Sequence, residues 1–314
     1  MKLCLLLGLV VSAGAVQENS NADLAPVTAN DRRVSFWYGP GSYGGGDINA
    51  TLALLAAHKD VVTNVFVYCG HSVGPGGLAF DAKLGAYCLD TGLLAGIRAL
   101  GIAPEIVVNS GSSDVVDYRA FFANASANVA ALAAEAKRFG AAGVSFDLEP
   151  QKGKPASTAA DALLYAAFLA TARAVLAPAG VRTTLAAAEW CAMTRDYGAL
   201  GAASDAVLDM ETYNADSMQG WLDGDAYGGY YERLVAGAGA AKAVPGMGAW
   251  NASCGGHPCW TTTPASGAAR LSRAAADGLR EVALFRIVQQ RGAEMMPQEW
   301  WWPLLAKFRN VTTA

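Results

Sequence analysis

The sequence predicts a single (β/α)₈ barrel, and three observations carry that prediction. Short apolar, strand-like runs alternate with helical segments eight times along the chain, which is the order expected of a barrel of eight parallel strands. The chain has 314 residues, of which 53% are hydrophobic, so it can bury one large core. No linker-like composition interrupts residues 32–314. We therefore expect this segment to form one domain.

Each strand is expected where β-branched and aromatic residues cluster, and each helix where apolar residues recur with helical period. Asp47 is an N-cap candidate, and Gly101 and Gly140 would end the second and third helices. The expected strands are 34–38, 62–68, 103–109, 143–150, 182–190, 207–213, 243–250 and 282–288. The expected helices are 48–58, 91–100, 115–139, 157–176, 193–203, 230–241, 265–277 and 299–309, and residues 69–88 are expected to form a long loop.

The fourth expected strand carries polar residues at strict two-residue spacing. Ser145, Asp147 and Glu149 alternate with large apolar residues, so the polar side chains share one face of the strand. Pro150 lacks a ladder donor where the strand should end. In a parallel barrel this face points into the mouth, where active sites lie at strand C-terminal ends. Asp147 and Glu149 are therefore predicted to be an acid and its helper, with a solvated strand end as the alternative.

Other polar and aromatic residues fall at the ends of other expected strands, so a barrel would bring them to the same mouth. Acids and amides mixed with flat aromatic rings suit a neutral carbohydrate, because rings stack on sugars and polar groups bind hydroxyls. For each aromatic residue taken alone, packing in the core or rim is the alternative. The predicted substrate-binding residues are Trp37, Tyr38, Asn109, Ser145, Glu189, Trp190, Glu211, Trp250 and Gln289, with Tyr213 beside the acids.

Charge and composition restrict the classes of molecule that the protein is expected to bind. The formal net charge is −4 and no basic run occurs, which gives no support to binding of nucleic acid or an anionic membrane. The three histidines, His58, His71 and His257, show no metal-ligand spacing, so neither a metal nor another cofactor is expected. We expect a monomer that binds an oligosaccharide or polysaccharide.

The N-terminus has the pattern of a signal peptide. Residues 1–15 combine Lys2, an apolar run and a small-residue cleavage site, and the run is too short to span a bilayer. Residues 16–31 form a short polar leader. A soluble protein, secreted or in the lumen of the secretory pathway, is expected. Glycans are expected on at least one of the first three of four sequons, which lie at Asn49, Asn124, Asn251 and Asn310.

Five cysteines remain once Cys4 leaves with the signal peptide. Two pairs bracket compact, Gly-containing loops that a disulfide could close. We predict the pairs Cys69–Cys88 and Cys254–Cys259, both in walls of the mouth, with Cys191 as a buried free thiol.

The fourth strand resembles a motif of the family 18 glycoside hydrolases, the chitinases and their relatives. Their pattern runs Asp-Gly-x-Asp-x-Asp-x-Glu. Gly143, Asp147 and Glu149 match its Gly, its third Asp and its Glu, whereas Ala142 and Ser145 stand where the family has Asp.

The resemblance extends in part to the sixth strand, whereas the last strand departs from it. Asp205 and Met210 keep the family's spacing, but Tyr213 comes one place late, and one residue reverses the face of a strand. Tyr213 then either reaches the site through a bulge or loses its family role. The last strand has Phe285 near its end, where chitinases usually have a Trp.

The resemblance implies a glycosidase that cleaves glycans containing N-acetylglucosamine, with the substrate's own N-acetyl group as nucleophile. Glu149 would protonate the glycosidic oxygen, Asp147 would orient the acetamido group, and Tyr213 would hydrogen-bond its oxygen. The Asp147 carboxylate is expected to raise the pKa of Glu149. Turnover is expected to be weak, because Ser145 cannot share a proton as a second Asp would.

Two alternatives stay open. Ser145 and Phe285 favour a lectin on the same barrel, whereas retention of Glu149 favours an enzyme. A retaining glycosidase with two carboxylates would need Glu189 or Glu211 as the second.

Overall fold

The computed structural model describes residues 32–38, 47–150, 156–188, 190–213, 229–249, 252–254, 257–260, 262–290, 293–295 and 297–310. The predicted signal peptide and leader, and the sequon at Asn251, lie outside the described residues.

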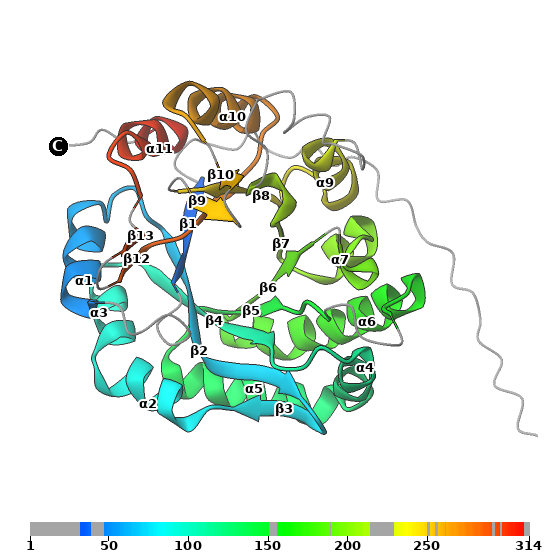
Figure 1. The fold of residues 1–314 in the computed structure, drawn as a ribbon. Helices are drawn as coiled ribbons and strands as arrows, with labels where there is room; N and C mark the ends of the chain where they lie inside the picture. The colour runs from blue at the N-terminus through cyan, green and yellow to red at the C-terminus, as the bar shows by residue number, and fades with distance from the viewer. Residues whose placement is uncertain are drawn as a thin grey trace, which may run out of the picture.

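Eight parallel strands close into a barrel with helices outside it, which confirms the predicted fold class (Figure 1). The strand order is β1–β11–β8–β7–β6–β5–β4–β2, and the pairing of β1 with β2 closes the cylinder. The barrel strands are β1 Arg33–Tyr38, β2 Asn64–Gly74, β4 Ala103–Ser110, β5 Gly143–Asp147, β6 Arg182–Ala187, β7 Ala206–Asp209, β8 Ala243–Gly248 and β11 Glu281–Phe285.

The outer helices begin and end largely at the predicted signals. The Asp47 side chain accepts a hydrogen bond from the Ala50 amide at the start of α1, and Gly140 ends α5 with a positive φ of 60°, a conformation that glycine adopts at little cost. The predicted helix 115–139 is two helices that meet at Asn124. The helices are α1 Ile48–Ala57, α2 Ala82–Asp90, α3 Leu93–Ala99, α4 Val115–Ala123, α5 Ala125–Phe139, α6 Ala159–Leu176, α7 Tyr197–Ala203, α9 Tyr230–Ala238, α10 Pro264–Ala276 and α11 Trp301–Arg309.

The prediction of a long loop at 69–88 was wrong. Strand β2 runs on to Gly74 and pairs with an antiparallel strand β3, Gly77–Phe80, after which Asp81 caps helix α2. The glycines that suggested a loop form the turn of this hairpin, since Gly76 and Gly77 have φ values of +89° and +125°. Such angles are strained for residues with a side chain.

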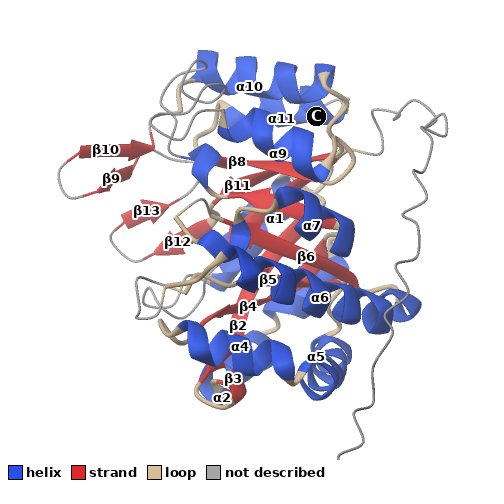
Figure 2. Ribbon diagram, turned by 90° about the vertical axis from the view of Figure 1, so that its right-hand side faces the viewer, coloured by secondary structure: helices blue, strands red, loops and turns tan. Residues whose placement is uncertain are grey.

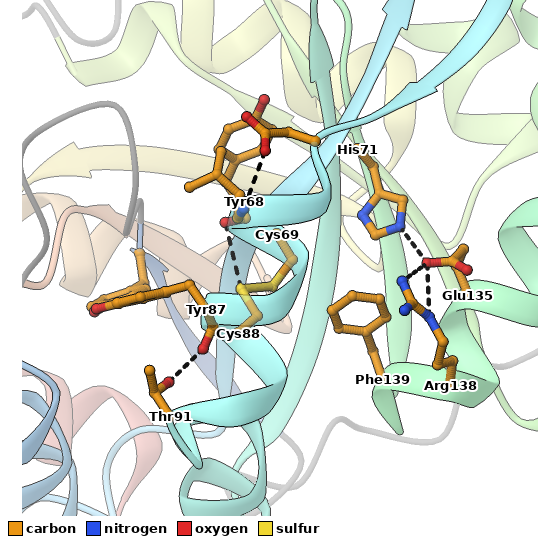
Figure 3. Close-up of a disulfide and its surroundings, with 12 residues drawn as sticks. Tyr68, Cys69, His71, Tyr87, Cys88, Thr91, Glu135, Arg138 and Phe139 are labelled. Carbon is orange, nitrogen blue, oxygen red and sulfur yellow. Dashed lines mark hydrogen bonds and ion pairs between the residues drawn. A yellow bond between two sulfur atoms is a disulfide. The ribbon is translucent and has the colours of Figure 1, made fainter.

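The disulfide Cys69–Cys88 is present, which confirms one of the two predicted pairs (Figure 3). Both cysteines are fully buried between β2 and α2, so the bridge lies in the core and not, as predicted, in a wall of the mouth. Cys191 is a buried free thiol, as predicted. The side chains of Cys254 and Cys259 lie outside the described part of the structure.

Helix α6 is long and apolar enough, by length and composition alone, to cross a membrane. It packs as a core helix of the barrel, because Tyr165, Phe168 and Leu169 are buried against the sheet side. Its buried Asp161 forms an ion pair with Arg119 of α4. We therefore assign α6 to the outer layer of the barrel.

Two core layers follow from strand alternation. Val144, Phe146 and Leu148 are fully buried in the layer between the sheet and the helices, as predicted for the apolar face of β5. A smaller layer, which includes Trp37 and Phe66, fills the inside of the barrel. Two short hairpins, β9 Ala252–Cys254 with β10 His257–Trp260 and β12 Val288–Gln290 with β13 Ala293–Met295, project from the strand C-terminal end (Figure 2).

Four charges close the inside of the barrel at the opposite end, where the strands begin. Arg182 donates to Glu105 and to Glu281, at 2.8 Å each, and Arg33 lies 3.4 Å from Glu281 and 3.8 Å from Glu105. A side chain at Gly143 would come within 2.6 Å of Glu105. Gly143 thus leaves room for this base cluster, which we define as Arg33, Glu105, Arg182 and Glu281.

Candidate active site

Asp147 and Glu149 lie together in the barrel mouth, where β5 ends. Strand β5 stops at Asp147, Leu148 is fully buried toward the helices, and Glu149 therefore points back to the Asp147 side. The two half-buried carboxyl groups hydrogen-bond each other. This is the arrangement that the alternation in the sequence predicted.

The pair retains protons more strongly than isolated carboxyl groups. Burial, followed by the charge of Glu149, raises the pKa of Asp147 well above its usual range. Burial also raises the pKa of Glu149, and hydrogen bonds from Asp147 and Trp190 offset part of that rise. The predicted direction for Glu149 is therefore right, but its main cause is burial and not repulsion by Asp147. A pair of this kind can hold one proton, and deliver it, at a pH where isolated carboxyl groups have already lost theirs.

Trp190 follows β6 and combines two roles in one side chain. Its indole hydrogen-bonds Glu149, yet 49% of the residue remains exposed. Thr194 fixes the preceding backbone, since its hydroxyl donates to the Ala188 carbonyl at 2.7 Å and accepts from the Ala188 amide at 3.2 Å. The exposed ring gives the mouth an apolar surface beside the acid.

Tyr213 reaches the mouth through a 3₁₀ turn. Strand β7 ends at Asp209, and residues Glu211–Tyr213 form the turn. The Thr212 hydroxyl holds it by donating to the Asp209 carbonyl at 2.9 Å and accepting from the Gly246 amide of β8 at 2.7 Å. A side chain at Gly246 would collide with the Tyr213 ring. The turn therefore absorbs the one-residue offset seen in the sequence.

The surroundings of Tyr213 tie it to the carboxyl pair. Burial, and then the charges of Asp147, Asp209 and Glu149, raise the pKa of its hydroxyl well above the usual range. The hydroxyl thus stays protonated and can donate a hydrogen bond. Phe285 stacks on the Tyr213 ring, with 5.5 Å between centroids, and supplies an aromatic side chain at the end of the last barrel strand.

Three other predicted residues lie on strands of the mouth, and one prediction was wrong. Trp37 is buried inside the barrel. Asn109 is half-buried, and its carboxamide oxygen accepts from the Ser110 amide at 2.6 Å. Ser145 is fully buried, and its hydroxyl has no hydrogen-bond partner among the described residues. Tyr38 is not in the site, because alternation turns it outward, where its hydroxyl lies 3.5 Å from that of Tyr87.

The remaining predicted residues cannot be placed by their side chains. Glu189 and Trp250 lie outside the described residues, as do the side chains of Glu211 and Gln289. The backbone of Glu211 belongs to the 3₁₀ turn, and that of Gln289 to hairpin β12–β13, beyond the barrel strand that the sequence assigned to it. Within the described ranges, no group of three or more His, Cys, Asp or Glu side chains could hold a metal ion.

Sequence reasoning missed the hydroxyl groups that hold the site. Ser110, Thr194 and Thr212 each bond backbone atoms at or just beyond the end of a barrel strand. Ser110 directly follows Asn109 in sequence, so a small hydroxyl residue at a strand end was the available signal. The backbone atoms that Ser110 and Thr212 bond on a neighbouring strand could not be read from the sequence.

Solved structures share this fold, although no protein-family model and no curated protein sequence matches the chain. A chitinase from Chromobacterium violaceum ATCC 12472 is 16% identical with a TM-score of 0.61, over 88% of this chain and 98% of that one. The class V chitinase from Nicotiana tobaccum is 11% identical with a TM-score of 0.63, over 90% and 100%. The spore cortex-lytic enzyme SleL from Bacillus cereus is 14% identical with a TM-score of 0.64, over 90% and 74%. The chain therefore has a chitinase-like glycoside hydrolase fold.

Proposed function

We propose that the protein is a glycosidase that hydrolyses glycans containing N-acetylglucosamine, with Glu149 as the proton donor. The observation that carries this proposal is the pair Asp147–Glu149, whose raised pKa values keep a proton available in the barrel mouth. The Tyr213 hydroxyl and the exposed Trp190 ring border the same pair. A protonated acid, a second hydroxyl donor and an apolar platform suit a neutral sugar better than a charged substrate.

The chemistry proposed is substrate-assisted. Glu149 gives its proton to the glycosidic oxygen as the bond from that oxygen to the anomeric carbon breaks. The oxygen of the substrate's acetamido group bonds to the anomeric carbon, with Asp147 accepting from the acetamido N–H and Tyr213 donating to its oxygen. Water then attacks the anomeric carbon, the acetamido oxygen leaves, and Glu149 takes a proton from the water. The acid is restored.

The test compares Glu149→Gln with Glu232→Gln, a matched control on the exposed face of α9. Chromogenic N-acetylglucosamine oligomers, glycoprotein glycans and non-acetylated glycans form the substrate panel. We expect wild-type hydrolysis of acetylated substrates only. Glu149→Gln should lower turnover by roughly 10²- to 10⁴-fold, the usual scale for a lost general acid, and Glu232→Gln should leave it unchanged.

A lectin is the second candidate, favoured by the Ser145 hydroxyl. It is buried on the same face of the strand as Asp147, without a hydrogen-bond partner in the described part of the chain. Because residue 145 is a serine, Glu149 is the one carboxyl group of this strand face that can share a proton with Asp147. A lectin would bind acetylated oligomers without hydrolysis, and Glu149→Gln would change affinity alone. Cleavage of glycans that lack an acetamido group would exclude substrate assistance and make Glu189 or Glu211 the candidate second carboxylate.

We also propose that the protein is secreted and glycosylated. The pattern of residues 1–15 supports secretion. Asn49 and Asn124 are exposed, so either could carry a glycan in the folded protein. Mass measurement of secreted material before and after glycosidase treatment tests this, and an unshifted mass with residues 1–15 retained would contradict it.

A further inference from the structure

The backbone that carries Glu149 is held beyond the end of its strand. Strands β4 and β5 pair in parallel from Glu105 with Gly143 to Asn109 with Asp147, and the register ends there. Glu149 lies two residues further on, followed by Pro150, which has no amide hydrogen to donate. The position of the proposed acid is therefore not set by the ladder of the sheet.

A single hydroxyl group continues the pairing across this gap. The Ser110 Oγ accepts a hydrogen bond from the Glu149 amide at 2.5 Å and donates to the Asp147 carbonyl at 3.3 Å. A serine hydroxyl has one hydrogen to donate and two lone pairs, so it can make both bonds at once. It links the backbone of the two carboxyl-bearing residues to the end of β4.

Ser110 is itself fixed on its other side. Its amide donates to the Asn109 carboxamide oxygen at 2.6 Å. Burial raises the pKa of Tyr118 to about 12, and the nearby Ser110 side chain works against that rise. The Tyr118 hydroxyl donates its one hydrogen to the Ser112 carbonyl at 2.7 Å. Helix α4 thus buttresses the loop that directly follows Ser110.

We propose that Ser110 is a positioning residue that sets the orientation of the Glu149 carboxyl group relative to Asp147. This inference rests on the proposed function, because it assigns Ser110 a part in proton delivery. Ser110 acts through the backbone and not through the substrate. Without its hydroxyl, the Glu149 amide and the Asp147 carbonyl would lose their common partner, and the segment 147–149 would rotate relative to β4.

The distinguishing experiment uses Ser110→Ala, Ser110→Thr and the control Ser113→Ala, an exposed serine in the loop that follows β4. A displacement of about 1 Å can cost up to about a hundredfold in rate, so we expect Ser110→Ala to lower kcat roughly ten- to hundredfold with KM within a fewfold. Its pH–rate profile should shift, because the hydrogen bond between the two carboxyl groups changes. Ser110→Thr retains the hydroxyl and should restore most of kcat, and Ser113→Ala should match the wild type.

A second measurement does not depend on hydrolysis. The Glu149 amide should exchange its hydrogen slowly in the wild type and in Ser110→Thr, and faster in Ser110→Ala at equal overall stability, as followed by NMR with thermal melting alongside. Wild-type kcat together with unchanged Glu149 exchange in Ser110→Ala would overturn the inference. If the wild type hydrolyses nothing in the panel, the proposed function fails, and amide exchange with carboxyl titration of Glu149 then decides whether Ser110 positions the pair.

Discussion

The Trp190 indole bonds the carboxyl group of Glu149 while half of its surface faces solvent. One residue thus contacts the proposed acid with its polar edge and offers its apolar face to a ligand. The indole has a polar N–H edge and an apolar face, so substitutions can remove the hydrogen bond alone or the hydrogen bond together with the ring.

Replacing Trp190 with Phe should remove the N–H and keep a ring. The hydrogen bond lowers the pKa of Glu149, so its loss should raise that pKa and move the alkaline limb of the pH–rate profile upward. Trp190→Ala should also raise KM, by roughly two- to tenfold for a lost ring contact. Steady-state kinetics from pH 4 to 9 measure both effects. An unmoved alkaline limb in Trp190→Phe would show that the indole does not act on Glu149.

Removing the charge of Glu149 should change the titration of Asp147. Burial and then the Glu149 charge raise the pKa of Asp147, so Glu149→Gln should lower it toward the ordinary carboxyl range, while burial keeps it somewhat elevated. NMR titration of the Asp147 carboxyl carbon in Glu149→Gln and in the wild type tests this. If the Asp147 pKa is the same in the two proteins, the charge of Glu149 does not act on Asp147.

The same pair should make the fold less stable as pH rises above the ordinary carboxyl range. Both native pKa values are raised, so the native state holds protons that the unfolded chain has already released, and stability falls until the native pair has titrated. The double variant Asp147→Asn with Glu149→Gln should lose this slope. Urea unfolding at successive pH values measures it, and equal slopes in the two proteins would be the contrary result.

The base cluster should matter for stability and not for turnover. Burial alone would raise the pKa of Glu281, but the charges of Arg182 and Arg33 outweigh burial and lower that pKa. At Glu105 burial has the larger effect, and the charge of Glu281 adds to it, so the pKa of Glu105 is raised. Arg182→Met would leave both carboxyl groups short of a partner and should lower the free energy of unfolding by about 3–5 kcal/mol. Lys137→Met, at an exposed position of α5, is the control. A similar loss in both variants would refute the special role of Arg182.

Gly246 should be essential for the position of Tyr213. A methyl group there would collide with the Tyr213 ring, so Gly246→Ala should displace the tyrosine and lower kcat about as much as Tyr213→Phe does. Gly198→Ala is a matched control, since its added carbon would meet its nearest neighbour at an ordinary 3.5 Å. Wild-type kcat in Gly246→Ala would mean that Tyr213 is not held as the structure shows.

Much of the fold and the centre of the site could be predicted because strand alternation is local. The period of two placed Ser145 and Asp147 on the inner face of β5, and Glu149 on the same side just beyond its end, without any knowledge of other strands. The same rule excludes Tyr38, since it and Trp37 are neighbours and cannot both point inward. Tyr38 has the side-chain chemistry of a sugar site, but the strand period places it on the outer face.

The rest depends on contacts between distant segments. The turn that brings Tyr213 into the mouth requires Thr212 to meet Gly246 on β8, and nothing near residue 212 indicates that partner. Likewise, the sequence shows isolated charges at the starts of four strands, but only closure of the barrel brings Arg182 between Glu105 and Glu281. Strand ends were also predicted too far along the chain at β6 and β7, because the bonds made by Thr194 and Thr212 are turn contacts.

The base cluster and the carboxyl pair occupy opposite ends of the same strands. Arg182 and Arg33 lower the pKa of Glu281, so it keeps its charge to a lower pH than an ordinary glutamate, whereas the carboxyl pair titrates above the ordinary range. The ion pairs of the base cluster and the proton of the carboxyl pair are therefore governed by separate groups. Substitutions around the mouth should shift the titration of the carboxyl pair and leave the contacts of Arg182 with Glu105 and Glu281 unchanged.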